Sequence, residues 1–186
     1  MPAARRTPRP DLLALLGKDS IGVEARAGDD DHLALKVWLR LLACSTQIET
    51  EIRKRLRSRF GITLPRFDYL AQLYRHPDGL RMNMLSRYMM VTGGNITGLT
   101  DDLEKDGLVV RETDASDRRS TRIKLTDAGR RALERIAAEH ESWLVELFGG
   151  VSPAGQEALY EQLGQLRVQL ARPGRRIPDP APEERS

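Results

Sequence analysis

The residues with the clearest chemical potential stand between two short β-like runs, Leu108–Glu112 and Thr121–Leu125. The connecting residues are mostly polar, as the tip of a β-hairpin requires. Turn chemistry does not explain two adjacent arginines, Arg118 and Arg119, with Asp117 beside them. A guanidinium is favoured in the minor groove of DNA, where negative potential is concentrated. A carboxylate two residues away can pair with that guanidinium and fix its direction.

The alternative is a surface ion pair, worth about 0–1 kcal/mol, that only stiffens the turn. The segment before the hairpin, TGGNITGLTDDLEKDGL, favours the DNA interpretation. Its pattern predicts a helix over about 93–105, with Thr92 as N-cap and Gly107 as the C-terminal stop. One face carries the apolar residues Ile96, Leu99 and Leu103. The opposite face offers small, uncharged residues, namely Gly94, Asn95, Thr97 and Gly98.

Such a helix can enter the major groove of DNA, which is about 12 Å wide. Asn95 can bind adenine through two hydrogen bonds, and Thr97 can contact a base edge, a phosphate or a thymine methyl group. Glycine at three of the six positions 93–98 weakens a helix, so a further requirement must favour it. The alternative is an amphipathic helix that packs against a protein partner.

These residues must be positioned by the elements around them. Hydrophobic spacing predicts a long helix from the acidic Asp29–Asp31 to Phe60, a second helix opened by Pro65, and a third over Met82–Met89. Two longer helices follow the hairpin. Short second, third and fourth helices before a two-stranded hairpin make a winged helix-turn-helix. The predicted fold class is therefore mainly α with a small β-hairpin wing, a winged helix-turn-helix domain plus a helical dimerisation layer.

The expected domain organisation follows from this order. The last helix starts at Ser152-Pro153, and four of its leucines are spaced by four, three and four residues, a seam that requires another helix: Leu159, Leu163, Leu166 and Leu170. The expected segments are a flexible basic N-terminal arm (1–30), a helical dimerisation region (31–60 and 127–171), a winged helix-turn-helix DNA-binding domain (61–126) and a disordered tail (172–186).

Composition narrows the function classes. The formal net charge of the 186 residues is only +3, but arginine and lysine are concentrated in two regions, 53–66 and 111–124. No apolar stretch approaches the roughly 20 residues of a spanning helix, so we expect a cytoplasmic protein without membrane contact. The three histidines lie far apart and no catalytic motif is present, which predicts no metal, no cofactor and no enzyme. The single Cys44 is expected to be a buried, inert thiol, with redox sensing as the alternative.

The span from about Leu80 to Gly129 resembles the MarR family of bacterial transcription regulators. The matching features are Leu85, Leu99, Leu103-Glu104, Gly107-Leu108, Arg111, Asp117-Arg118-Arg119, Leu125-Thr126 and Gly129. With the helix order, the resemblance extends over about three quarters of the chain. It implies an obligate homodimer, repression relieved by a ligand or by oxidation, Arg119 as the minor-groove arginine and Asp117 as its orienting partner. The sequence departs from the family pattern in having no basic residue between Thr92 and Glu104.

The resemblance also implies an effector pocket where the dimerisation helices meet the winged domain. The first helix brings Trp38, Arg40 and Thr46 to that region, and the second brings Arg66 and Tyr69. An arginine beside aromatic surface suits a small aromatic carboxylic acid. The expected partners are therefore a double-stranded DNA operator, a second copy of the chain and such an acid. A winged-helix module for protein contacts that does not bind DNA remains the alternative.

Overall fold

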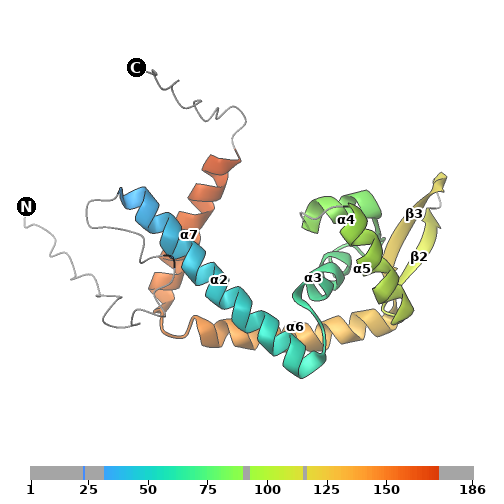
Figure 1. Ribbon diagram of the computed structural model, residues 1–186, viewed down its shortest axis with the longest axis horizontal. Coiled ribbons are helices and arrows are strands. Elements are labelled where there is room, and N and C mark those ends of the chain that lie inside the picture. The colour runs from blue at the N-terminus through green and yellow to red at the C-terminus, as the bar shows by residue number, and fades with distance from the viewer. Residues whose placement is uncertain (1–22, 24–31, 90–92, 115–116, 172–186) are drawn as a thin grey trace, which may run out of the picture. The chain divides into compact units, whose positions relative to one another are not determined.

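The computed structural model describes residue 23 and residues 32–89, 93–114 and 117–171; the side chains of 114 and 117–120 are not described. The expected N-terminal arm, apart from residue 23, the C-terminal tail and Thr92 thus lie outside the described residues. The chain divides into two compact units, Met1–Trp143 and Leu144–Ser186. The elements, drawn in Figure 1, are α2 (Leu33–Phe60), α3 (Leu64–Tyr74), β1 (Leu80–Arg81), α4 (Met82–Met89), α5 (Gly93–Lys105), β2 (Val109–Asp114), β3 (Asp117–Leu125), α6 (Asp127–Leu147) and α7 (Pro153–Leu170).

The helices begin and end where the punctuating residues predict. α2 ends at Gly61, whose left-handed φ of 63° lets its N–H bond back to the last turn. Gly107 has a φ of 70° and stops α5 in the same way. Pro65 lies in the first turn of α3, and the Ser152 hydroxyl caps α7 by accepting a hydrogen bond of 3.2 Å from the Gly155 N–H. The predicted fold class is confirmed.

The sheet has three strands: the predicted two-stranded hairpin is present as β2 and β3, and the short strand β1 was not predicted. β3 lies in the middle, antiparallel to both β2 and the short β1. β1 pairs Leu80 with Ile123 and Arg81 with Arg122. Two residues are too few to produce an alternating hydrophobic pattern, which is why the sequence did not predict this strand. β1 fixes the base of the wing to the start of α4.

The core of the first unit lies between α3, α5 and the sheet. α3 contributes Leu70 and Leu73, which are almost fully buried, and α4 contributes Leu85. Ile123 from the central strand and Val109 from β2 cover the other side. Figure 1 shows the three short helices gathered against this sheet. The winged region therefore has its own hydrophobic core, which supports α5 from behind.

An aromatic cluster joins α2, α3 and α6 within the first unit. The ring centroids of Phe60 and Trp143 are 6.1 Å apart, and those of Phe67 and His140 are 4.8 Å apart. Arg55 lies over the Trp143 ring at 6.0 Å, a cation–π contact. Burial lowers the pKa of His140, so this imidazole is neutral near pH 7 and packs as an aromatic ring.

The start of α6 explains the Leu-Thr-x-x-Gly motif. The Thr126 hydroxyl donates to the Gly107 carbonyl (2.7 Å) and accepts from the Gly129 N–H (3.0 Å), so one side chain caps α6 and holds the end of α5. The Thr126 N–H also donates to the Leu108 carbonyl at 3.1 Å. A Cβ atom on Gly129 would overlap that same carbonyl oxygen. Only glycine lets α6 begin this close to the turn that leads into the wing.

We predict that Gly129→Ala lowers the free energy of unfolding by about 1–3 kcal/mol, because the added methyl group forces α6 away from Leu108. Thermal or denaturant unfolding of the full chain measures the change. Gly164→Ala is the matched control, since its added Cβ meets nothing within 4 Å and alanine favours the helix. Equal stability of Gly129→Ala and the wild type would contradict the close-approach explanation.

Candidate nucleic-acid interface

The outer face of α5 has the character that the sequence predicted. Gly94, Asn95, Thr97 and Gly98 are all exposed. A Cβ atom built on Gly94 or on Gly98 would meet nothing within 4 Å. Both are helical positions without a positive φ, so neither the backbone conformation nor packing in the described residues requires glycine there. The lack of side chains at these two positions therefore leaves the surface open to a binding partner outside this chain.

The inner face of α5 is held by a buried hydrogen-bond network. Thr100 is fully buried, and its hydroxyl donates to the Ile96 carbonyl at 2.7 Å. The fully buried Tyr69 hydroxyl lies 2.6 Å from the same oxygen, and because Thr100 has only one proton, Tyr69 must be the donor. Burial raises the pKa of Tyr69, which keeps this donor protonated. The bond fixes the position of α5 on α3.

Sequence reasoning identified only part of this face. Ile96 and Leu103 are buried as predicted, whereas Leu99 is half-buried. Thr100 was missed, although its place four residues after Ile96 and three before Leu103 puts a polar group on the apolar face. A polar residue at a core position of an amphipathic helix requires a buried partner, and this would have been the signal.

A second connection ties α5 to the wing. The guanidinium of Arg111 on β2 forms ion pairs with both Asp101 and Glu104 of α5. The Arg111 backbone N–H also donates to Glu104 Oε1 at 3.2 Å. The hydrogen bond to Asp101, followed by that to Glu104, raises the pKa of Arg111 above its already high range, while burial opposes the shift. A permanently charged side chain thus joins the wing to the helix.

The wing is a hairpin in which β2 and β3 pair from Val109 opposite Leu125 to Asp114 opposite Asp117. The register shifts between Thr113 and Asp114, close to the tip. Lys124 and Glu112 form a 2.8 Å ion pair across its stem. The backbone of the Asp117-Arg118-Arg119 segment belongs to β3, at the tip end of the hairpin, and its side chains lie outside the described residues. Their DNA contacts remain a prediction.

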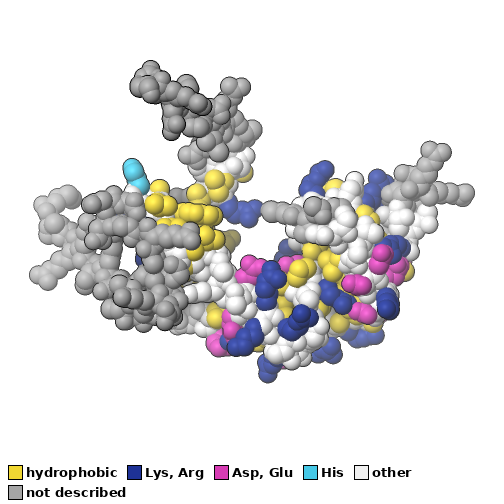
Figure 2. Space-filling model, viewed as in Figure 1, with side chains coloured by type: hydrophobic (Ala, Val, Ile, Leu, Met, Phe, Trp, Pro, Cys, Tyr) yellow, Lys and Arg dark blue, Asp and Glu magenta, His cyan; other side chains and the backbone are white. Residues whose placement is uncertain are grey.

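The other basic cluster, on the second half of α2, is largely neutralised. Arg53 pairs with Glu49 and Arg55 pairs with Glu51 at 2.7 Å, both with the spacing of one helical turn. Arg59 pairs with Glu139 of α6. Figure 2 shows basic and acidic side chains interleaved over the winged region. The cluster on α2 therefore has the character of a solvated helix face.

The five predicted effector-binding residues are not brought together. Trp38, Arg40 and Thr46 are exposed along the first half of α2. Tyr69 is fully buried and bonded to Thr100. Arg66 lines a cavity between the helices. The expectation for Cys44 was wrong for the single chain, because its thiol is exposed.

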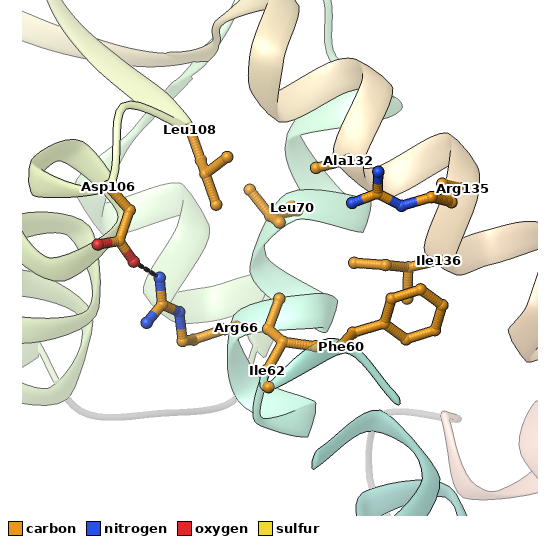
Figure 3. A pocket seen from close by; sticks show the side chains of 10 residues that line it. Phe60, Ile62, Arg66, Leu70, Asp106, Leu108, Ala132, Arg135 and Ile136 are labelled. Atoms are coloured by element: carbon orange, nitrogen blue, oxygen red, sulfur yellow. Dashed lines mark hydrogen bonds and ion pairs between the residues drawn. The ribbon is translucent and has the colours of Figure 1, made fainter. Parts of the chain in front are cut away.

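That cavity has a volume of about 260 Å³ and lies where α2, α3, α6 and the end of α5 meet. Its walls are mostly apolar, and Arg66, Asp106 and Arg135 add charge. Arg66 forms an ion pair with Asp106, as Figure 3 shows. The Nε atom of Arg66 is buried and has no hydrogen-bond partner among the described residues. The apolar lining residues are Phe60, Ile62, Leu70, Leu108, Ala132 and Ile136.

Two further structural findings concern the predictions of no metal site and no membrane contact. Within residues 32–89, 93–114 and 117–171, no three metal-binding side chains come together in a suitable group. In the same part of the chain, no helix combines the length and hydrophobicity needed to cross a bilayer.

Comparison with known proteins agrees with this geometry. A sequence model of the MarR family matches residues 60–120. The uncharacterized HTH-type transcriptional regulator YkoM of Bacillus subtilis is 34% identical over 100 residues, which are 53% of this chain and 64% of that protein. An uncharacterized HTH-type transcriptional regulator of Bacillus cereus is 30% identical over 138 residues, 74% of this chain and 90% of that protein.

A solved structure extends the similarity to the fold. Sco3205 of Streptomyces coelicolor, a MarR family transcriptional regulator in complex with DNA, superposes with a TM-score of 0.66 and 26% identity. The match covers 78% of this chain and 95% of that one. The family match includes α5 and much of the wing, and the Bacillus cereus relative extends the similarity to 74% of the chain. The chain belongs to the MarR family of transcriptional regulators.

Proposed function

We propose that this MarR family member is a ligand-responsive repressor that binds a pseudo-palindromic operator as a homodimer. The observation that carries the proposal is the outer face of α5, which is exposed, uncharged in its first half and bare at Gly94 and Gly98. A helix without side chains at these positions brings its backbone close to base edges in the major groove. Protein packing among the described residues does not account for the two glycines.

The side chains beside the glycines supply the base contacts. Asn95 binds an adenine through its amide, and Thr97 contacts a base edge, a thymine methyl group or a phosphate. Thr92, which precedes α5 in the sequence, binds a phosphate together with backbone N–H groups of the first turn. Since no basic residue lies between Thr92 and Glu104, DNA shape contributes to operator choice alongside these contacts.

The wing provides the second contact with DNA. Arg119 enters the minor groove next to the recognition helix, Asp117 orients its guanidinium, and Arg118 binds the phosphate backbone. The antiparallel pairing of β2 with β3 supports this proposal because it puts the backbone of all three residues at the far end of the hairpin. The ion pair between Lys124 and Glu112 stiffens the stem beneath them.

Homodimerisation is supported by apolar side chains that neither unit buries. The first half of α2 exposes Leu33, Val37 and Trp38, each by more than half of its surface. Figure 2 shows hydrophobic side chains gathered over the start of this helix. In the second unit, α7 has no buried residue and exposes Leu159, Tyr160, Leu166, Val168 and Leu170. Apolar faces of this extent mark protein interfaces, and a two-fold dimer presents two α5 helices to half-sites about 10 base pairs apart.

The cavity around Arg66 is the best-supported place for the effector. Its apolar side chains, with Phe60 among them, suit an aromatic ring, and Arg66 offers a buried Nε–H that has no acceptor among the described residues. A ligand carboxylate fits this fork in a bidentate pair. The carboxylate of the acid replaces Asp106 as the ion-pair partner of Arg66. Because Asp106 immediately follows α5, loss of this ion pair weakens the attachment of the recognition helix to α3.

We predict that Arg119→Ala weakens operator binding by about 1–3 kcal/mol without unfolding the protein. The probe is the DNA duplex that the wild-type protein enriches from a random library, and fluorescence anisotropy measures the affinity. Arg59→Ala is the matched control, because it removes one positive charge from a surface pair between α2 and α6. Unchanged affinity of Arg119→Ala would refute the minor-groove role, and a single asymmetric site in a footprint would refute the symmetric dimer.

The effector proposal has its own test. In a thermal-shift screen of benzoates, hydroxycinnamates and pyridine carboxylates, we expect at least one acid to stabilise the protein and release the enriched duplex. Arg66→Gln should lose this binding while Arg40→Gln keeps it, because Arg40 does not line the cavity. Loss in Arg40→Gln alone would place the site at Trp38, Arg40 and Thr46. No response to any acid, with release by peroxide, would favour sensing through Cys44.

A further inference from the structure

The outer face of α5 changes character along its length. The first half, which holds Gly94, Asn95, Thr97 and Gly98, carries no charge. Asp101 follows Thr97 by four residues and Gly98 by three, so it lies on the same face one turn further on. Its side chain is 59% exposed. A helix that enters a DNA groove through this face therefore brings a carboxylate towards the phosphates.

Arg111 lies across this carboxylate. It extends from β2, pairs with Asp101 on the outer face and with Glu104 on the flank of α5, and is itself only 30% exposed. The backbone N–H of the same residue holds Glu104 from a second direction. One cation thus offsets part of the negative charge of this acidic turn of α5 while connecting the turn to the wing. Another pair on the wing, Glu112 with Lys124, joins β2 to β3 and does not involve α5.

We infer that Arg111 is a positioning residue for DNA binding that acts by masking the carboxylates of Asp101 and Glu104 from the phosphate backbone. The inference rests on the proposed contact of α5 with DNA. It assigns to Arg111 a role distinct from that of Arg119: Arg111 touches the helix and not the DNA, and acts on affinity through the charge of α5.

Arg111→Ala could weaken DNA binding by uncovering the carboxylates or by loosening the wing. These two causes differ in their response to salt and to replacement of the carboxylates by amides. Repulsion between an uncovered carboxylate and phosphates weakens as the Debye length falls from about 10 Å at 0.1 M salt to about 3 Å at 1 M. A defect caused by masking therefore shrinks as salt rises, and it disappears when the carboxylate is replaced by an amide. A defect caused by a loose wing has neither property.

The experiment measures binding of the full chain to the enriched duplex between 50 and 300 mM salt. The proteins are the wild type, Arg111→Ala, Asp101→Asn, and Arg111→Ala combined with Asp101→Asn and Glu104→Gln. Arg59→Ala is the matched control, since it also removes an arginine that pairs across two elements, but away from α5. Circular dichroism confirms that each variant is folded.

We expect Arg111→Ala to bind roughly tenfold more weakly at low salt, with the defect decreasing as salt rises. The triple variant should regain most of the affinity, and Asp101→Asn alone should bind at least as tightly as the wild type, because it removes one carboxylate and leaves Arg111 balanced by Glu104. Arg59→Ala should differ little from the wild type.

Three results would overturn the inference. These are unchanged binding by Arg111→Ala, a defect that salt and the amide substitutions leave in place, or weaker binding by Asp101→Asn. If Arg111→Ala fails to fold, Asp101→Asn still distinguishes the two causes. If Arg111 only held the wing in place, Asp101→Asn should lose DNA affinity, whereas masking predicts no loss. If the wild type enriches no duplex at all, the proposed DNA function fails, and this outcome is distinct from a failure of Arg111 alone.

Discussion

The hydrogen bond between the buried hydroxyls of Tyr69 and Thr100 is the interaction on which the rest of the winged region depends. α5 carries exposed glycines in its first turn, at Gly94, and in its interior, at Gly98, and an interior glycine costs about 1 kcal/mol of helix stability relative to alanine. Such a helix cannot rely on its own propensity and must be stabilised from behind. Ile96, Leu103 and the Tyr69–Thr100 bond provide that support, and they leave the opposite face bare. One side of α5 thus stabilises the helix against the core, and the opposite side stays exposed.

The end of α5 is where the other elements connect. Thr126 holds the Gly107 carbonyl while it caps α6, and Gly129 lets α6 start against Leu108. Asp106, one residue before this turn, pairs with Arg66 of α3 at the cavity, and Glu104, three residues before it, pairs with Arg111 of the wing. A change at Arg66 therefore acts within a few residues of the contacts that orient both α5 and the wing. The proposed coupling of a ligand in the cavity to DNA would use this short path.

The sequence predicted the helices and the wing because their signals are local. Glycine at positions 61 and 107 and proline at 65 mark helix ends through backbone conformation, which depends on few neighbours. The sequence did not predict the features that depend on contacts between residues far apart in the chain. Nothing local indicates that the two residues of β1 pair with Ile123 and Arg122, that Thr100 meets Tyr69, or that Arg66 lies beside Asp106. The candidate α5 surface was predictable because one helix supplies it, whereas a pocket assembled from four segments was not.

The central claim is that the outer face of α5 is kept bare for DNA, and Gly98→Ala tests it most directly. The added methyl group meets nothing within 4 Å in the protein and favours the helix, so it should leave stability unchanged or raise it by up to about 1 kcal/mol. Against the enriched duplex, the same methyl group should weaken binding, because it holds the helix away from the base edges. A variant that is at least as stable as the wild type and binds DNA less tightly is the predicted result. Unchanged affinity for that duplex would contradict the claim.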